Sequence, residues 1–272
     1  MRRSVFFISD GTGITAETLG HSLLAQFGTV DFERHTLPYV GSQERAREAV
    51  KRINEIAEAD GCKPIIIDTI VDREIRSIIA SANASMFDVF ETFVDKLAQE
   101  LGETPMLAVG KSHSVNTQTY KTRIDAIHYA LDNDDGARTR HYDMADIILI
   151  GVSRSGKTPT CIYMALQFGL RAANYPLTED DLDGESLPRS LKEHKSKLFG
   201  LIIDADRLTS IRNERKANSR YASPQQVMRE LRAIESIYIK ENIPFLDVSE
   251  MSVEEIATRI IAQKGLNRRI SS

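Results

Sequence analysis

One stretch decides the fold of this chain: Asp146-Ile147-Ile148-Leu149-Ile150-Gly151-Val152-Ser153-Arg154-Ser155-Gly156-Lys157-Thr158. Its first part, Asp146–Ile150, is a short apolar run of the kind that forms a buried strand. Gly151–Thr158 then fits the pattern G-x-x-x-x-G-K-[ST] at every fixed position. The residues from Thr158 to Phe168 favour a helix, which Gly169 would end. A strand, a glycine-containing turn and a helix in this order predict a phosphate-binding loop.

The chemistry expected of this loop is the binding of nucleotide phosphates. The glycines let backbone N–H groups approach phosphate oxygens, and the following helix adds the positive end of its dipole. Lys157 would reach the transferable phosphate, and Thr158 would hold magnesium. The residues expected to contact the nucleotide are Gly151, Val152, Ser153, Arg154, Ser155, Gly156, Lys157 and Thr158. The alternative is a strand–helix turn that holds no ligand.

Strand-like runs alternate with helix-length stretches along the rest of the chain, which predicts an α/β protein with mainly parallel sheets. We expect an N-terminal α/β domain over residues 1–104, a connector with one helix over residues 105–143, and a P-loop kinase-like domain over residues 144–272. The expected strands are Val5–Ser9, His35–Val40, Pro64–Thr69, Asp146–Ile150, Ala172–Pro176, Leu198–Asp204 and Pro244–Val248. A helix is expected over Phe87–Leu101.

Composition limits the classes of function. The 272 residues are 42% hydrophobic and carry a formal net charge of −4, which predicts no general affinity for nucleic acid. No apolar run is long enough to span a bilayer, and Val5–Ile8 is too short for the core of a signal peptide. Cys62 and Cys161 form no CxxC pair, so neither a disulfide framework nor a structural zinc site is expected. We therefore expect a cytoplasmic enzyme that does not enter the membrane.

Carboxylates after two of the expected strands could complete a phosphoryl-transfer site. Asp204 closes the apolar run Leu198–Ile203. A carboxylate at the end of a strand can orient magnesium or accept the proton of an attacking hydroxyl. Capping the helix that follows is an equally supported role for Asp204. Asp180 and Asp181 are weaker candidates for the same chemistry, and they could simply cap a surface turn.

A basic stretch follows this strand and contains Arg207, Arg212, Arg215, Lys216 and Arg220. In small P-loop kinases such a stretch forms a lid whose arginines neutralise phosphate charge in the transition state. We expect Arg212, Arg215 and Arg220 to act in such a lid. A solvated helix face is the alternative for each of them.

Two other polar segments are less specific. Asp10-Gly11-Thr12-Gly13 is a second glycine-containing turn between a strand and a helix, and it could hold an anion, although such turns are common without ligands. The acidic cluster Asp132–Asp135 follows an expected helix, where its carboxylates oppose the helix dipole. A solvated turn ended by Gly136 is the alternative, and the spacing does not fit an EF-hand calcium site.

Several segments together form a specific set of motifs: Ile8–Glu17, Arg123–Ile127 with Asp134–Gly136, Gly151–Pro159, Ala173–Pro176 and Ser252–Ala257. They resemble the signatures of the bacterial pyruvate,phosphate dikinase/phosphoenolpyruvate synthase regulatory proteins. The resemblance runs nearly end to end and is greatest to the phosphoenolpyruvate synthase branch.

This resemblance implies a bifunctional enzyme. One activity would transfer the β-phosphate of ADP to a threonine of phosphoenolpyruvate synthase and inactivate it. The other would use inorganic phosphate to remove that phosphoryl group, forming pyrophosphate. ADP and inorganic phosphate would be substrates, with magnesium held by Thr158 and Asp204. A single site could serve both reactions, with Lys157 and Arg154 offsetting charge and Asp204 acting as the base.

Three alternatives remain open on the residues alone. The target could be pyruvate,phosphate dikinase. The chain could instead be a nucleotide-gated binding protein, in which ADP only switches the affinity for a partner, or a small-metabolite kinase that uses ATP. A homodimer is compatible with the sequence.

Overall fold

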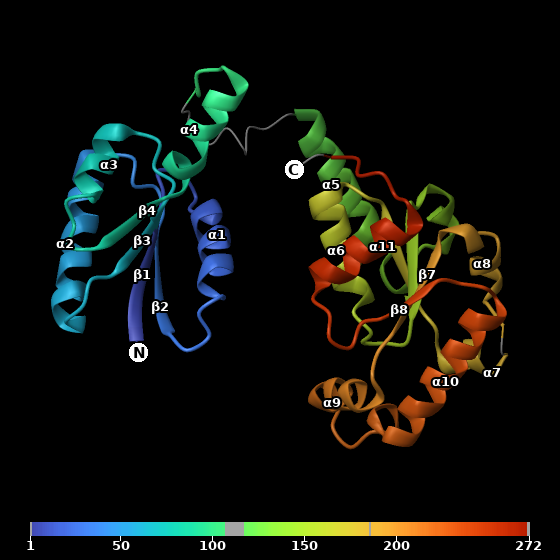
Figure 1. The fold of residues 1–272 in the computed structure, drawn as a ribbon. Helices are drawn as coiled ribbons and strands as arrows, with labels where there is room; N and C mark the ends of the chain where they lie inside the picture. Colours follow the sequence, from blue (N-terminus) through green and yellow to red (C-terminus); the bar gives the residue numbers. More distant parts are fainter. Residues whose placement is uncertain (1, 107–116, 185, 271–272) are drawn as a thin grey trace. The chain divides into compact units, whose positions relative to one another are not determined.

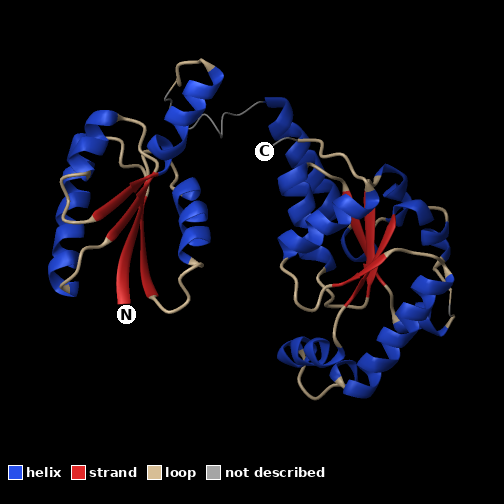
Figure 2. Ribbon diagram, viewed as in Figure 1, coloured by secondary structure: helices blue, strands red, loops and turns tan. Residues whose placement is uncertain are grey.

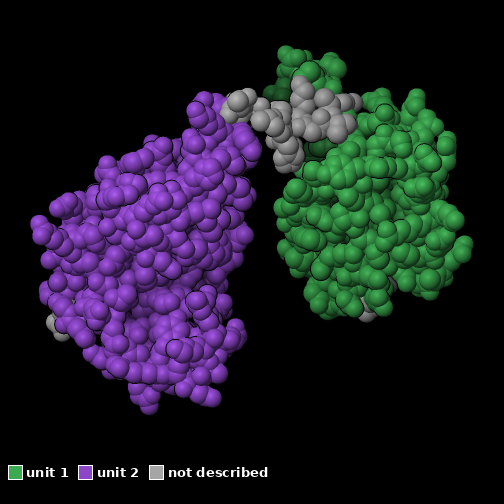
Figure 3. Space-filling model, turned by 180° about the vertical axis from the view of Figure 1, so that it is seen from behind, with its two compact units in different colours: residues 1–114 green, residues 115–272 purple. Residues whose placement is uncertain are grey.

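The computed structural model describes residues 2–106, 117–184 and 186–270. They form two compact units, one within residues 1–114 and the other within residues 115–272 (Figure 1, Figure 3). Each unit has its own four-stranded parallel sheet, with helices on both faces (Figure 2). The predicted α/β fold with mainly parallel sheets is therefore confirmed. Of the expected connector, residues 107–116 lie outside the described residues.

The N-terminal unit alternates strands and helices. Its elements are β1 (Arg2–Ile8), α1 (Ile14–Leu24), β2 (Asp31–Leu37), α2 (Gln43–Asp60), β3 (Ile65–Asp68), α3 (Arg73–Ile79), β4 (Ser85–Asp88) and α4 (Val89–Leu101). The strand order is β2-β1-β3-β4, and every pair is parallel. Because β1 lies between β2 and β3, the direction in which strands are added reverses there. Open parallel sheets bind ligands beside the carboxyl ends of the strands at such a point.

Strand β1 divides the core of this unit into two layers. Its side chains alternate between the two faces of the sheet, as the pleat of a strand requires. Phe6 and Ile8 pack with buried residues of α2 and α3, whereas Val5 and Phe7 pack with those of α1. Helix α1 lies close to the sheet because Gly20 has no side chain, and a Cβ at that position would overlap the Phe7 ring.

The expected helix over Phe87–Leu101 is wrong at its start. Ser85–Asp88 is strand β4, whose Met86 is in register with Ile66 of β3, and α4 begins at Val89. The strand has only four residues and lies at the edge of the sheet. So short a segment shows no periodicity that separates a strand from a helix. Its pairing with β3 therefore decides its conformation.

The second unit begins with α5 (Thr117–Asp132), which packs against α6. The elements that follow are η2 (Asp134–Gly136), η3 (Thr139–Met144), β5 (Ile147–Gly151), α6 (Lys157–Phe168), β6 (Ala172–Pro176), α7 (Glu179–Asp183), α8 (Arg189–Lys192), η4 (Lys195–Lys197), β7 (Leu198–Ile202), α9 (Ala205–Arg215), η5 (Arg220–Ala222), α10 (Pro224–Lys240), β8 (Phe245–Asp247) and α11 (Val253–Lys264). The strand order is β6-β5-β7-β8, with every pair parallel.

Strand β5 is the best-buried strand of this sheet, since all five of its residues are buried between β6 and β7. Tyr238 of α10 ties the helix layer to the sheet, because its hydroxyl donates a 2.9 Å hydrogen bond to the Ile150 carbonyl. Gly200 of β7 lies directly under the Tyr238 ring, where an added Cβ would come within 2.5 Å of a ring carbon. The end of β5, and with it the start of the phosphate loop, is thus bonded to α10.

Two helix starts follow local sequence signals. Ser223 accepts a hydrogen bond from the Gln226 amide at the start of α10, and Ser252 forms a capping box with Glu255 at the start of α11. Within the described residues, no helix has the length and apolar character that crossing a membrane requires.

Candidate active site

The predicted phosphate loop connects β5 to α6 at the carboxyl edge of the second sheet. Two of its residues adopt left-handed backbone conformations, Arg154 with φ 75° and Gly156 with φ 86°. Gly151 needs its glycine for a different reason: a Cβ there would lie 2.8 Å from both the Leu201 carbonyl oxygen and the Ser155 hydroxyl. The loop is therefore folded tightly against β7. It leads into a helix whose N-terminus favours anions.

Lys157 is buried within this loop, with only 4% of its surface exposed. Its ammonium donates a 2.8 Å hydrogen bond to the carbonyl of Val152 in the same loop. Burial lowers the pKa of Lys157 from 10.5 to about 8; nearby Asp135 and Asp134 act against this, while Arg212 adds to it. A buried cation with one backbone partner is poorly satisfied. A phosphate group would supply the missing charge.

Asp134 lies directly beside the loop. Its Oδ1 accepts a 2.7 Å hydrogen bond from the Thr158 hydroxyl and another from the Asn174 side-chain amide. Asn174, at 0% exposure in β6, also accepts a 3.1 Å bond from the backbone amide of Asp135. The segment before β5, the phosphate loop and the neighbouring strand thus meet at one carboxylate.

The sequence shows the acidic cluster but does not place Asp134 in the site. The alternative of a solvated turn is wrong for Asp134, because its carboxylate is bonded to Thr158 and Asn174. Gly136, which ends the cluster, has φ 73° and lies against the ring of Tyr175. A Cβ added at this glycine would come within 2.9 Å of a ring carbon. The signals that could have found this site were the acidic cluster and a polar Asn within an otherwise apolar strand.

Asp204 has the geometry of a helix cap. Its Oδ1 accepts 2.9 Å hydrogen bonds from the backbone amides of Asp206 and Arg207 at the start of α9, and its side chain is exposed. Its position after β7 is at the same edge of the sheet as the phosphate loop, since β5 and β7 are parallel neighbours. The catalytic role expected for Asp204 stays a prediction.

The weaker carboxylate candidates also take part in capping. Asp181 completes a capping box with Thr178 at the start of α7, and its Oδ1 accepts a 3.4 Å hydrogen bond from the Tyr175 hydroxyl. Asp180 is exposed in the same first turn.

The three arginines expected in a lid occupy different environments. Arg212 is 1% exposed and forms an ion pair with Glu230 at 2.7 Å. Arg215 is exposed, and Arg220 pairs with Glu179 at an exposed position. A lid role for Arg215 and Arg220 stays a prediction. Arg212 is instead buried and contacts the phosphate loop at Ser153.

Arg212 supports the loop from that side. Its guanidinium donates to the carbonyl of Ser153 at 3.3 Å and to that of Tyr221 at 3.0 Å, and it lies 4.2 Å from the centre of the Tyr221 ring. The Tyr221 hydroxyl donates to Ser153 Oγ at 2.9 Å. Two side chains from beyond β7 therefore hold Ser153, Arg212 at its backbone carbonyl and Tyr221 at its hydroxyl, a contribution that the motif alone does not reveal.

The second glycine-containing turn has mainly structural contacts. Asp10 accepts a 2.8 Å hydrogen bond from the backbone amide of Val71, so it joins the loop after β1 to the loop after β3. Gly13 supplies the left-handed residue, φ 83°, that precedes α1.

A P-loop with a buried lysine on a parallel sheet, in a chain that also contains a second α/β unit, defines a class: nucleotide-dependent phosphotransferases. Comparison with known proteins narrows this class. Residues 5–261 match the model of the Kinase/pyrophosphorylase family. The chain belongs to this family, and it is therefore a phosphotransferase whose substrates are a nucleotide and phosphate.

Relatives match over almost the entire chain. A protein of Acinetobacter baumannii (strain ATCC 17978) is 64% identical over 270 residues, which is 99% of this chain and 97% of that protein. One of Alcanivorax borkumensis is 59% identical over 271 residues, 99% of this chain and 100% of the relative. One of Marinobacter nauticus is 58% identical over 269 residues, 98% of this chain and 99% of the relative. Each of these relatives bears the name "Putative phosphoenolpyruvate synthase regulatory protein".

Proposed function

We propose that this protein regulates phosphoenolpyruvate synthase in both directions. As an ADP-dependent kinase it would phosphorylate a threonine of the synthase and inactivate it. As a phosphate-dependent pyrophosphorylase it would remove the phosphoryl group and restore activity. Family membership supports the two reaction types, and the names of the relatives support the choice of target over pyruvate,phosphate dikinase. Action in the cytoplasm and assembly as a homodimer stay predictions.

The observation that carries the proposal is the buried Lys157 in a glycine-containing loop. Among the described residues, the Val152 carbonyl is the one hydrogen-bond acceptor of its ammonium. Ser155 Oγ, in the same loop, is buried and has no hydrogen-bond partner among the described residues. Buried groups left in this state are usually completed by a ligand or an ordered water molecule. The two phosphates of ADP fit such a cradle, because each brings several acceptor oxygens.

In the forward reaction, the threonine hydroxyl of the target attacks the β-phosphorus of ADP. The bond from that phosphorus to the bridging oxygen breaks, AMP leaves with the oxygen, and a carboxylate takes the hydroxyl proton. In the second reaction, which dephosphorylates the target, an oxygen of inorganic phosphate attacks the phosphothreonine phosphorus. The bond to the threonine oxygen breaks, that oxygen regains a proton, and pyrophosphate forms. Lys157 would offset the charge of the two phosphates in both directions.

Asp134 is the carboxylate that we propose for the proton transfer. It is already bonded to Thr158, the loop residue expected to hold magnesium. When bound, magnesium would neutralise phosphate charge, and the Thr158 hydroxyl would hold it while Asp134 accepts the proton. Asp204 is the candidate that the sequence favoured, although its Oδ1 already caps α9.

The test is incubation of purified phosphoenolpyruvate synthase with ADP labelled at the β-phosphate, followed by mapping of the label. We expect the label on one threonine. Asp134→Asn should slow the transfer about 100-fold or more, as the loss of a group that acts on the transition state commonly does. Asp206→Asn, an exposed neighbour of Asp204, is the matched control and should remain active. If Asp204→Asn is inactive and Asp134→Asn active, the assignment of the base is wrong.

If one site catalyses both reactions, a second result is expected. ADP should compete with inorganic phosphate in the release of pyrophosphate from the phosphorylated target, and Lys157→Ala should damage both directions. Non-competitive inhibition together with a Lys157→Ala variant that still releases pyrophosphate would move the second chemistry to another site. The binding-protein alternative predicts ADP binding without label transfer, and the metabolite-kinase alternative predicts transfer from ATP to a small acceptor.

A further inference from the structure

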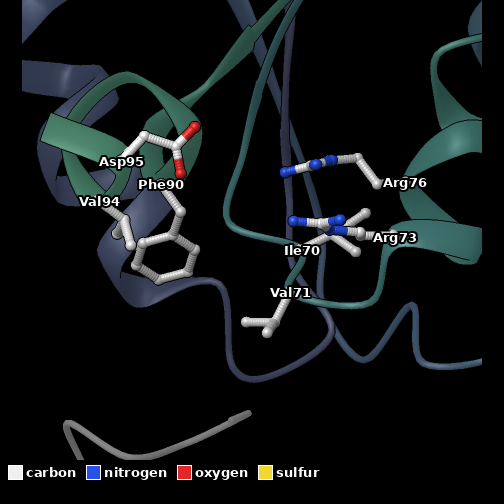
Figure 4. A pocket seen from close by; sticks show the side chains of 7 residues that line it. All are labelled: Ile70, Val71, Arg73, Arg76, Phe90, Val94 and Asp95. Carbon is white, nitrogen blue, oxygen red and sulfur yellow. The ribbon is translucent and has the colours of Figure 1, made fainter. Parts of the chain in front are cut away.

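The N-terminal unit contains a cavity of about 320 Å³, and none of its lining residues belongs to the phosphate loop. It lies beyond the carboxyl end of β3, between the loop that follows this strand, helix α3 and helix α4 (Figure 4). Ligands of open parallel sheets bind at this edge, near the point where the strand order reverses. Here that point is the β1–β3 pair, whose following loops are joined by the bond from Val71 to Asp10.

One wall of the cavity is positively charged. Arg73 and Arg76 both extend from α3 toward α4 and line the cavity (Figure 4). Arg76 forms an ion pair with Asp88. Arg73 is exposed and has neither an ion pair nor a side-chain hydrogen bond among the described residues. Arg73 is thus the guanidinium available to a ligand.

The opposite wall belongs to α4 and has two parts. Phe90 and Val94 are apolar and face the arginines across the cavity (Figure 4). Asp95 adds a carboxylate to the same wall, and within the described part of the chain it makes no ion pair with Arg73 or any other cation. The cavity therefore presents a cation and a carboxylate on opposite walls, with an apolar surface beside the carboxylate.

A buried acid bonded to a lining residue of the cavity provides an independent observation. Asp68, at the end of β3, is 0% exposed. One of its oxygens accepts a 3.2 Å hydrogen bond from the amide of Ile70, which lines the cavity, and the other has no partner among the described residues. Burial raises its pKa to about 7, with Asp88 and Asp10 contributing and Arg76 opposing. Such unsatisfied buried acids are concentrated at functional sites.

We propose that this cavity binds a small organic acid that also carries a hydrogen-bond donor. Its carboxylate pairs with Arg73, its carbon skeleton packs on Phe90 and Val94, and its donor group reaches Asp95. The planar guanidinium fork matches a carboxylate, and the volume is at the lower end of small-molecule sites. The ligand would give the N-terminal unit a binding function of its own, beyond phosphoryl transfer.

Calorimetric titration of the full-length protein tests the proposal, with saturating ADP present to occupy the phosphate loop. The probes share one phenyl body: phenyllactate has the carboxylate and a hydroxyl donor, hydrocinnamate lacks the hydroxyl, and hydrocinnamyl alcohol lacks the carboxylate. Phenyllactate should bind most tightly and the alcohol least. Arg73→Gln should weaken phenyllactate binding about ten-fold or more, since it removes a hydrogen bond to a charged group. Arg52→Gln, an exposed arginine on α2, is the matched control and should not change it.

Two further variants locate the probe. Asp95→Ala should remove the advantage of phenyllactate over hydrocinnamate, and Val94→Phe should weaken all three probes by filling the cavity. The variants change exposed or half-buried side chains, and circular dichroism checks that each one folds. The proposal is overturned if phenyllactate does not bind at millimolar concentration, or if Arg73→Gln binds it as the wild type does.

Discussion

Replacing Lys157 with Met should stabilise the ligand-free protein while it abolishes both reactions. Burial lowers the pKa of Lys157 from 10.5 to about 8, which corresponds to about 3 kcal/mol at roughly 1.4 kcal/mol per pH unit. Loss of the hydrogen bond to the Val152 carbonyl lowers this gain in stability by about 1 kcal/mol. Met has a similar length and no charge, so the free energy of unfolding should rise by on the order of 2 kcal/mol.

The measurement is scanning calorimetry of the full chain with and without ADP. A gain of this size should raise the Tm of the second unit by on the order of 5 °C, at roughly 2–4 °C per kcal/mol for a unit of this length. Added ADP should reverse the order of stability. ADP stabilises the wild type by binding, whereas the variant lacks the Lys157 ammonium that would pair with the phosphates. Lys192→Met, at an exposed position, is the matched control and should leave the Tm near that of the wild type.

The pH dependence has a definite sign. The pKa of Lys157 is lower in the folded state than in the unfolded chain, so between about pH 8 and 10.5 the unfolded chain binds more protons. The stability of the wild type relative to Lys157→Met should therefore rise through this window, and below about pH 8 the full difference should be present. A Met variant that melts below the wild type at neutral pH would refute the reasoning, since Lys157 would then stabilise the empty loop.

Three other substitutions have expected outcomes. Asp68→Asn should stabilise the N-terminal unit above about pH 7 by on the order of 4 kcal/mol, because burial raises the pKa of Asp68 from 3.8 to about 7; the gain in Tm should vanish below pH 4, and an equal gain at every pH would contradict it. Arg212→Ala leaves Glu230 without its ion-pair partner and should lower the free energy of unfolding by about 3–5 kcal/mol, measured with denaturant; a loss under 1 kcal/mol would show that the pair does not stabilise the fold. Gly151→Ala should weaken ADP binding at least ten-fold in calorimetric titration, because its Cβ would collide with the Leu201 carbonyl oxygen; unchanged affinity would mean that β5 and β7 can separate.

Local signals predicted the parts of this protein that depend on neighbouring residues. The apolar run before Gly151, the loop glycines and the helix from Lys157 lie next to each other in the chain, so the phosphate loop and its strand and helix could be read directly. The capping residues Ser223 and Ser252 mark helix starts for the same reason. The alternation of strands and helices was enough to predict parallel sheets, since a parallel pair requires a crossover connection.

Tertiary structure decided what depends on strand order and side-chain packing. Asp134, Thr158 and Asn174 come together because β6 lies beside β5 and the segment before β5 crosses its end. Arg212 carries the sequence features of a solvated lid residue, yet it is buried behind Ser153. Periodicity in the sequence reports which face of an element is apolar but not which element covers it. The neighbours of a side chain are fixed only when the sheets assemble and exclude water.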